Sequence, residues 1–192
     1  LDHAATTYLD SRVREAMGLY WSEEFGNPSS LYRQGRRAKD ALDSARASIA
    51  KILNGKPEEI IFTGGGTEAI NLALFGVLRF YALNTINPRG HIITTKIEHH
   101  AVLHACEALQ KEGFEITYLN VDEYGLVDPE DVKKALRSDT ILVAIMYANN
   151  EIGTIEPIEE IGKIIKEFRV LANGENNSKP HTLNAKPFFL TD

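Results

Sequence analysis

The sequence predicts an α/β fold in which helices flank a mostly parallel central sheet. From residue 91 onward, short apolar runs alternate with segments of helical periodicity. The run at 140–146 (TILVAIM) is almost wholly apolar, as expected for a strand that is covered on both faces. Polar clusters follow several of the apolar runs directly, at the place where parallel sheets carry their functional groups. Strands that alternate with helices therefore indicate an α/β layer structure.

Composition limits the class of protein. The 192 residues are enough for a sizeable core, and a hydrophobic content of 43% with 25% charged residues is ordinary for a globular domain. A net charge of −6 argues against general attraction to nucleic acid or to anionic membranes. The apolar runs are too short to span a membrane. Cys106 is the single cysteine, which excludes an intrachain disulfide and fits the cytoplasm.

The first part of the chain predicts three helices and one strand. Apolar residues recur at helical spacing over 11–20 and again over 32–53, where the Asn54-Gly55 pair ends the second helix. The apolar stretch at 59–62 predicts a short strand. A helix follows the three glycines and covers 67–81.

The rest of the chain alternates regularly between strands and helices. Asp128 supplies an N-cap and Pro129 a first-turn proline for one of these helices. The predicted strands cover 91–95, 115–120, 140–146 and 187–191, the predicted helices 101–111, 128–136 and 158–171, and a polar loop covers 173–186.

Both ends of the sequence indicate a piece of a longer protein. The chain begins Leu1-Asp2-His3 without a methionine, and it ends two residues after the apolar run at 187–190. Natural termini usually lie loose at the surface rather than beside an apolar strand. We therefore expect a truncated domain.

Three consecutive glycines stand between the predicted strand at 59–62 and the helix that follows it. Such a turn lets a ligand approach the backbone, and the helix that Thr67 opens directs free N–H groups toward it. The segment Gly64-Gly65-Gly66-Thr67 thus fits a phosphate site. It contains neither a dinucleotide-binding glycine motif nor a P-loop. The alternative is a plain turn with Thr67 as N-cap.

Other polar residues also follow predicted strands. His99 comes after the strand at 91–95, Asn149 and Asn150 after that at 140–146, and Asp192 after the last. Each has a structural alternative, as a hydrogen-bonded histidine or a turn-forming asparagine. If the strands run parallel, these groups meet at one edge of the sheet.

Two further residue types are weighed and set aside. His100 and His104 have the spacing of metal ligands on a helix, but no paired cysteines or further histidine motif accompany them, so no metal site is expected. Cys106 lies in an apolar helix with no flanking cation, so we expect a small core residue rather than a nucleophile.

Taken together, these motifs carry a resemblance that covers nearly the whole chain. Its pieces are LDHAATT at 1–7, FGNPSS at 25–30, EIIFTGGGTEAINLAL at 59–74, HIITTKIEHHAVL at 91–103, GFEITYL at 113–119, ILVAIMYANNEIGTIEPI at 141–158 and FFLTD at 188–192. The chain resembles the cysteine desulfurases of the iron–sulfur cluster assembly type, within the class V aminotransferase family of pyridoxal-phosphate enzymes. It departs mildly in its glycine triplet, where the family usually has Ser-Gly-Ala, and in a longer loop at 173–186.

The resemblance implies the fold and the roles of individual residues. It implies the fold type I of pyridoxal-phosphate-dependent transferases, with 1–10 as an N-terminal arm and 11–192 as an incomplete cofactor-binding domain. Gly66 and Thr67 look like contacts of the cofactor phosphate, and His99 like the catalytic residue that stacks on the pyridine ring. Asn150 is similar to the amide beside the ring hydroxyl, and Asp192 to the carboxylate that pairs with the pyridinium nitrogen.

The implied activity converts L-cysteine to L-alanine and leaves the sulfur as an enzyme persulfide. A homodimer and a sulfur-acceptor or iron–sulfur scaffold protein are the implied partners, without nucleic acid or membrane. A selenocysteine lyase, or another class V enzyme, stays open, as does a non-catalytic fold fragment or interaction module. None of Lys96, Lys163, Lys166 and Lys186 lies in the family's Schiff-base motif. We therefore expect the 192-residue chain alone to be inactive.

Overall fold

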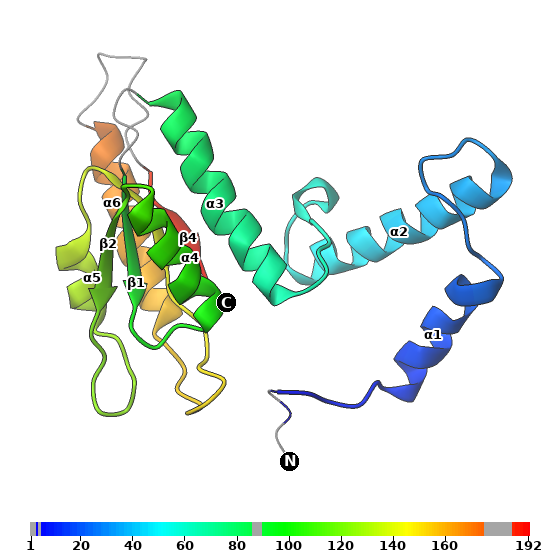
Figure 1. Ribbon diagram of the computed structural model, residues 1–192, viewed down its shortest axis with the longest axis horizontal. Coiled ribbons are helices and arrows are strands. Elements are labelled where there is room, and N and C mark those ends of the chain that lie inside the picture. Colours follow the sequence, from blue (N-terminus) through cyan, green and yellow to red (C-terminus); the bar gives the residue numbers. More distant parts are fainter. Residues whose placement is uncertain (1–2, 4, 86–89, 175–185) are drawn as a thin grey trace. The chain divides into compact units, whose positions relative to one another are not determined.

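The computed structural model describes residue 3 and residues 5–85, 90–174 and 186–192. It divides into two compact units, Leu1–Phe62 and Thr63–Asp192. The first unit contains helices α1 (Ser11–Ser22) and α2 (Arg33–Ile52) and the short 3₁₀ helix η1 (Pro57–Glu59) (Figure 1). Both helices predicted here are confirmed.

Local chemistry accounts for the ends of these helices. The Asp10 side chain accepts from the Arg12 backbone N–H and caps α1. After α2, Asn54 has a φ of 53°, a left-handed conformation that asparagine tolerates better than most residues. The Asn54-Gly55 signal therefore ends α2 as predicted.

The strand predicted at 59–62 is wrong. Pro57, Glu58 and Glu59 form the 3₁₀ helix, and Ile60 is extended but has no strand partner among the described residues. The Ile60 carbonyl instead accepts from the guanidinium of Arg46, which also lies over the Phe62 ring, 4.8 Å from its centroid. An apolar run becomes a strand only when a neighbouring strand completes its hydrogen bonds.

The second unit is a three-layer α/β structure. Four parallel strands lie in the order β2-β1-β3-β4, which confirms the mostly parallel sheet. The strands are β1 (His91–Thr95), β2 (Glu115–Leu119), β3 (Thr140–Ala144) and β4 (Phe188–Leu190), and the helices are α3 (Gly66–Asn84), α4 (His100–Lys111), α5 (Pro129–Ala135) and α6 (Ile158–Gly174). All of the elements predicted from 67 to 171 are confirmed within a few residues.

Alternate residues of the strands divide between two cores. Ile92 packs with residues of α3 and α4, whereas its neighbour Ile93 packs with residues of α5 and α6. All five residues of β1 and all five of β3 are buried. The central strands are therefore covered on both faces, as their apolar sequences predicted.

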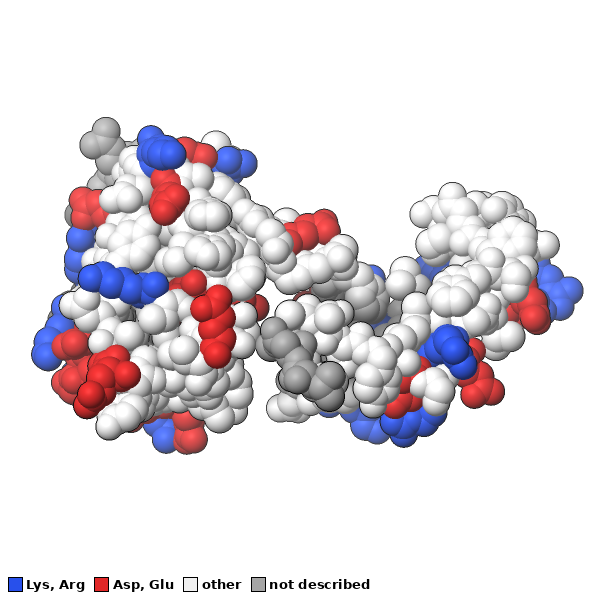
Figure 2. Space-filling view, turned by 60° about the horizontal axis from the view of Figure 1, so that its bottom comes forward, with Lys and Arg blue, Asp and Glu red and all other residues white. Residues whose placement is uncertain are grey.

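Four smaller observations complete the fold. Asp128 accepts from the Glu130 backbone N–H as the predicted N-cap of α5, with Pro129 in the first turn. Most of the loop predicted at 173–186 lies outside the described residues. On the face drawn in Figure 2, acidic and basic side chains lie intermixed. No helix in the described ranges is long and apolar enough to cross a membrane.

Candidate active site

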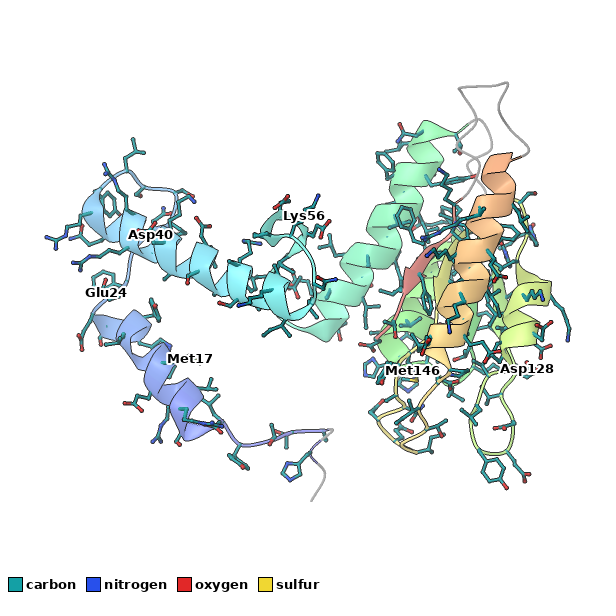
Figure 3. All side chains as sticks on the ribbon, turned by 180° about the vertical axis from the view of Figure 1, so that it is seen from behind. Met17, Glu24, Asp40, Lys56, Asp128 and Met146 are labelled. Carbon is teal, nitrogen blue, oxygen red and sulfur yellow. The ribbon has the colours of Figure 1, made fainter. Side chains whose placement is uncertain are left out.

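The carboxyl ends of β1, β3 and β4 lie at the same edge of the sheet because the strands are parallel. The segment after β1 carries Glu98 and His99, and the segment after β3 carries Asn149 and Asn150. Asp192 comes two residues after β4. Figure 3 labels Met146, which stands at this end of the sheet. Three of the four strand ends that were predicted to converge do so.

The fourth group, at the N-terminus of α3, is formed by the glycine triplet. The Glu68 carboxylate accepts from the Gly64 N–H at 2.7 Å, and Thr63 Oγ1 donates to the Gly65 carbonyl at 3.1 Å. The first N–H groups of α3, on Gly66 and Thr67, have no partner within the helix. A Cβ placed on Gly65 or Gly66 would meet nothing within 4 Å. This turn therefore has open space beside Gly65 and Gly66, and the first two N–H groups of α3 have no partner within the helix.

A pocket of about 410 Å³ lies between α3 and α4. The α3 helix contributes Thr67, Asn71 and Phe75, and α4 contributes His100 and His104, with His99 at its start. The His100 and His104 rings stack, with their centroids 5.2 Å apart. The structure thus brings two of the predicted site residues, Thr67 and His99, to one pocket.

His99 is held by the helix that it begins. Its Nδ1 atom accepts from the Ala101 backbone N–H at 3.1 Å and caps α4. An Nδ1 atom that accepts a hydrogen bond carries no proton, so the single N–H of a neutral imidazole here is on Nε2. The capping bond leaves the Nε2 side of the exposed imidazole available to a ligand.

Asn150 and Asp192 lie at the same edge of the sheet but do not line this pocket. Asn150 is an exposed turn residue. The backbone carbonyl of Asp192 accepts from the Tyr147 N–H at 2.9 Å, which holds the exposed Asp192 beside the end of β3. Gly66, the first residue of α3, does not line the pocket itself, but it directly precedes Thr67, which does.

Glu98 is a candidate that the sequence analysis missed. Its side chain is 5% exposed, and its Oε1 atom accepts from Thr95 Oγ1 at 2.8 Å and from the Met146 N–H at 3.0 Å. Burial raises the pKa of Glu98 to about 7, with further contributions from Asp192 and Glu156. The only signal in the sequence that could have identified Glu98 is its position directly before His99.

Asn149 was predicted to lie at this edge of the sheet, with a turn-forming asparagine as the alternative. It is buried, and its hydrogen bonds extend beyond the turn. Its Oδ1 atom accepts from the N–H groups of Glu151 and Ile152, at 2.9 Å and 3.1 Å. Its Nδ2 atom donates to the Ile97 carbonyl at 3.0 Å. Asn149 therefore links the segment after β3 to the segment after β1.

Two other features concern the residues that were set aside. Cys106 is fully buried in the core between α4 and the sheet, which confirms the expected core position, and burial raises the pKa of its thiol to about 12. In the part of the chain that the structure describes, no three His, Cys, Asp or Glu side chains are arranged to hold a metal ion.

Comparisons with known proteins agree with this architecture. Residues 1–173 match the family model described as Aminotransferase class-V. The chain is 58% identical over 170 residues to "Cysteine desulfurase IscS" of Dictyoglomus turgidum, a match that covers 88% of this chain and 42% of the relative. The chain thus spans less than half the length of this relative.

Solved structures give the same result in three dimensions. A structure described as "NIFS-LIKE PROTEIN" matches all of this chain and 47% of its own, with a TM-score of 0.86 and 37% identity. Another, described as "SspA in complex with cysteine", matches 87% of this chain and 47% of its own, with a TM-score of 0.82 and 39% identity. These matches confirm the expected fold. The chain belongs to the class V aminotransferase family.

Proposed function

We propose that this chain is the N-terminal part of a pyridoxal-phosphate-dependent cysteine desulfurase. The full-length enzyme converts L-cysteine to L-alanine and keeps the sulfur as an enzyme persulfide. The observation that carries the proposal is the shared pocket of Thr67 and His99 at the start of two helices. The relative that is 58% identical bears the name of this activity, and one structural neighbour is described in complex with cysteine.

The residues at the start of α3 fit a phosphate group. Unbonded first-turn N–H groups and the positive end of the helix dipole attract an anion, and the Thr67 hydroxyl adds a donor. The space in front of Gly65 and Gly66 is open. The Glu68 carboxylate already binds the Gly64 N–H, which leaves the N–H groups of Gly66 and Thr67 for the ligand.

The other site residues have roles that follow from their chemistry. His99 would lie against the pyridine ring, with its orientation held by the bond from the Ala101 N–H. Asp192 would keep the pyridinium nitrogen protonated, because a nearby carboxylate favours the charged form of the ring. Asn150 would contact the ring hydroxyl. Pyridoxal phosphate, when bound, supplies an electron sink for charge that develops at the substrate α-carbon.

This chain supplies part of the site only. It spans 42% of the relative named above, and we propose that the Schiff-base lysine and the persulfide-forming cysteine lie in the remainder. Residues 1–10 form an arm of a small domain, and 11–192 form most of the cofactor-binding domain. The enzyme is a cytoplasmic homodimer that passes sulfur to an acceptor or iron–sulfur scaffold protein.

The experiment is a cofactor-binding and turnover assay on the full-length protein. With pyridoxal phosphate and L-cysteine we expect alanine and sulfide in the presence of a thiol reductant, and a visible absorption band from the bound cofactor. Thr67→Val and His99→Asn each weaken cofactor binding by about tenfold or more, because a missing hydrogen-bond donor or ring contact costs about 1–3 kcal/mol. Asparagine keeps the capping acceptor at position 99, so the loss reports the ring itself.

The control is Glu123→Gln, which changes an exposed carboxylate and leaves binding unchanged. A full-length protein that binds no pyridoxal phosphate contradicts the proposal. A protein that turns over L-selenocysteine but not L-cysteine replaces the proposed substrate with the selenium analogue.

A further inference from the structure

We propose that Glu98 and Asn149 are positioning residues that together fasten the His99 segment to the segment carrying Asn150. Each of these two side chains hydrogen-bonds to the backbone of the other segment, and we call the pair Glu98 and Asn149 the clasp. This inference rests on the proposed function, because it assigns an alignment role to residues next to the cofactor site.

The first half of the clasp is Glu98. It lies on the segment after β1, but its Oε1 atom accepts from the N–H of Met146, which lies on the segment after β3. The same oxygen accepts from Thr95 Oγ1, so the carboxylate is tied both to its own strand and to the neighbouring one. Glu98 directly precedes His99, and a shift of its backbone would move the imidazole.

In the second half, the side chain comes from the segment after β3 and bonds to the backbone of the segment after β1. Asn149 lies after β3, and its Nδ2 atom donates to the carbonyl of Ile97 on the segment after β1. Its Oδ1 atom accepts from the N–H groups of Glu151 and Ile152, and these bonds shape the turn that contains Asn150. Residues 97 and 98 are thus bonded to residues 149 and 146, and in both bonds the donor lies on the segment after β3.

Both side chains of the clasp are buried. Glu98 is 5% exposed and Asn149 is 8% exposed, although both are polar. A buried carboxylate costs stability unless its surroundings compensate, so this position is an expensive one for a purely structural contact. The charged groups that act on Glu98 are Asp192 after β4 and Glu156 after β3, and Glu98 in turn raises the pKa of Cys106 on α4. Glu98 therefore also lies electrostatically next to the proposed partner of the pyridinium nitrogen.

The clasp predicts a pattern across matched variants. Glu98→Gln keeps an oxygen that accepts from both Thr95 and Met146, whereas Glu98→Ala removes it. Asn149→Asp keeps the turn-forming acceptor but loses the donor to Ile97, and Asn149→Ala loses both. Glu123→Gln is the control for removing a carboxylate.

The test uses the full-length apoprotein, so its result does not depend on catalysis. Hydrogen exchange of peptides that cover 96–100 and 146–152 reports the clasp directly. We expect faster exchange at both segments in Glu98→Ala, Asn149→Asp and Asn149→Ala, and wild-type exchange in Glu98→Gln and Glu123→Gln. Pyridoxal phosphate affinity falls about ten- to 100-fold in the three variants that open the clasp, because small misplacements at a site are costly.

A pH profile separates positioning from simple stability. The NMR chemical shift of the Met146 amide, observed with ¹⁵N-methionine labelling, changes with pH as the Glu98 carboxyl titrates. This change is absent in Glu98→Gln. If Glu98→Ala does not fold, Asn149→Asp and the Met146 signal still decide the outcome. Unchanged exchange at both segments in Asn149→Asp, or a Met146 shift that persists in Glu98→Gln, overturns the inference. Failure of the wild-type protein to make alanine refutes the proposed function instead. The hydrogen-exchange result still decides whether Glu98 and Asn149 hold the two segments together.

Discussion

The His91 ring bridges two strands, with Nδ1 lying 2.9 Å from Thr140 Oγ1 and Nε2 lying 2.8 Å from Thr117 Oγ1. His91 is completely buried at the start of β1, and its two threonine partners come from β3 and β2. Because both ring nitrogens are bonded inside the protein, this histidine is part of the scaffold at the amino ends of the strands.

His91 predicts a dependence of stability on pH. Burial lowers its pKa, with a smaller contribution from Arg137 in the same direction. The unfolded chain therefore takes up the proton more readily, and the contribution of His91 to stability is present above its ordinary pKa of about 6.5. It is lost as the pH falls below that value toward the lowered folded pKa.

The measurement is urea unfolding of the wild type and of His91→Gln between pH 5 and 8. We expect the wild type to lose stability relative to the variant as the solution becomes more acidic. At pH 8, His91→Ala lowers the free energy of unfolding by about 3 kcal/mol, through a cavity and unpaired threonine hydroxyls. Parallel pH curves for wild type and His91→Gln contradict the prediction.

Glu98 predicts a pH effect of the opposite sign. Its folded pKa is raised to about 7 from 4.5, chiefly by burial. The contribution of the buried carboxyl to stability is present below pH 4.5 and is lost as the pH rises through about 7. The Glu98→Gln variant has no such titration, so above pH 7 we expect it to be more stable than the wild type by a few kcal/mol, on the order of 3.

This difference is measured as the melting temperature of wild type minus that of Glu98→Gln at each pH. Subtraction removes the contribution of His91, which both proteins share. A difference that stays constant between pH 4.5 and 8 shows that the carboxyl titrates alike in the folded and unfolded chains. If Glu98→Gln is the more stable protein, Glu98 lowers the stability of the fold, as polar residues kept for function often do.

Cys106 is predicted to be unreactive in the folded protein. Burial raises the pKa of its thiol to about 12, so very little thiolate exists at neutral pH. Iodoacetamide should label the peptide containing Cys106 only after denaturation, as read by mass spectrometry. Cys106→Ala should retain alanine formation in the full-length enzyme and cost about 1 kcal/mol of stability. Loss of activity in a folded Cys106→Ala protein would contradict its assignment to the core.

Asp128 is predicted to stabilise α5 as its N-cap. Its Oδ1 atom lies 2.9 Å from the Glu130 N–H, and Asp128→Ala removes this acceptor. We expect a loss of about 1 kcal/mol in unfolding free energy and wild-type stability in Asp128→Asn, which keeps a capping oxygen. The comparison is made by urea unfolding at pH 7. Equal losses in both variants would assign the effect to charge instead of capping.

Much of the second unit follows from local sequence patterns. The almost wholly apolar run at 140–146 predicted a strand covered on both faces, and β3 is buried along its whole length. The Asp128-Pro129 pair predicted the start of α5 because capping depends on neighbours only two or three residues away. The positions of His99, Asn150 and Asp192 after strands also follow from the sequence, once the strands are taken as parallel.

Contacts between distant residues decided the rest. The strand expected at 59–62 is absent because its backbone has no neighbouring strand among the described residues, and Arg46 takes the Ile60 carbonyl. Glu98 is buried where the segment carrying Met146, 48 residues away, bonds to it, and this burial raises its pKa. Apolar periodicity and caps act over a few residues and can be read in order along the chain. Strand pairing and the burial of a carboxylate depend on which distant segments meet, and only the tertiary structure brings those together.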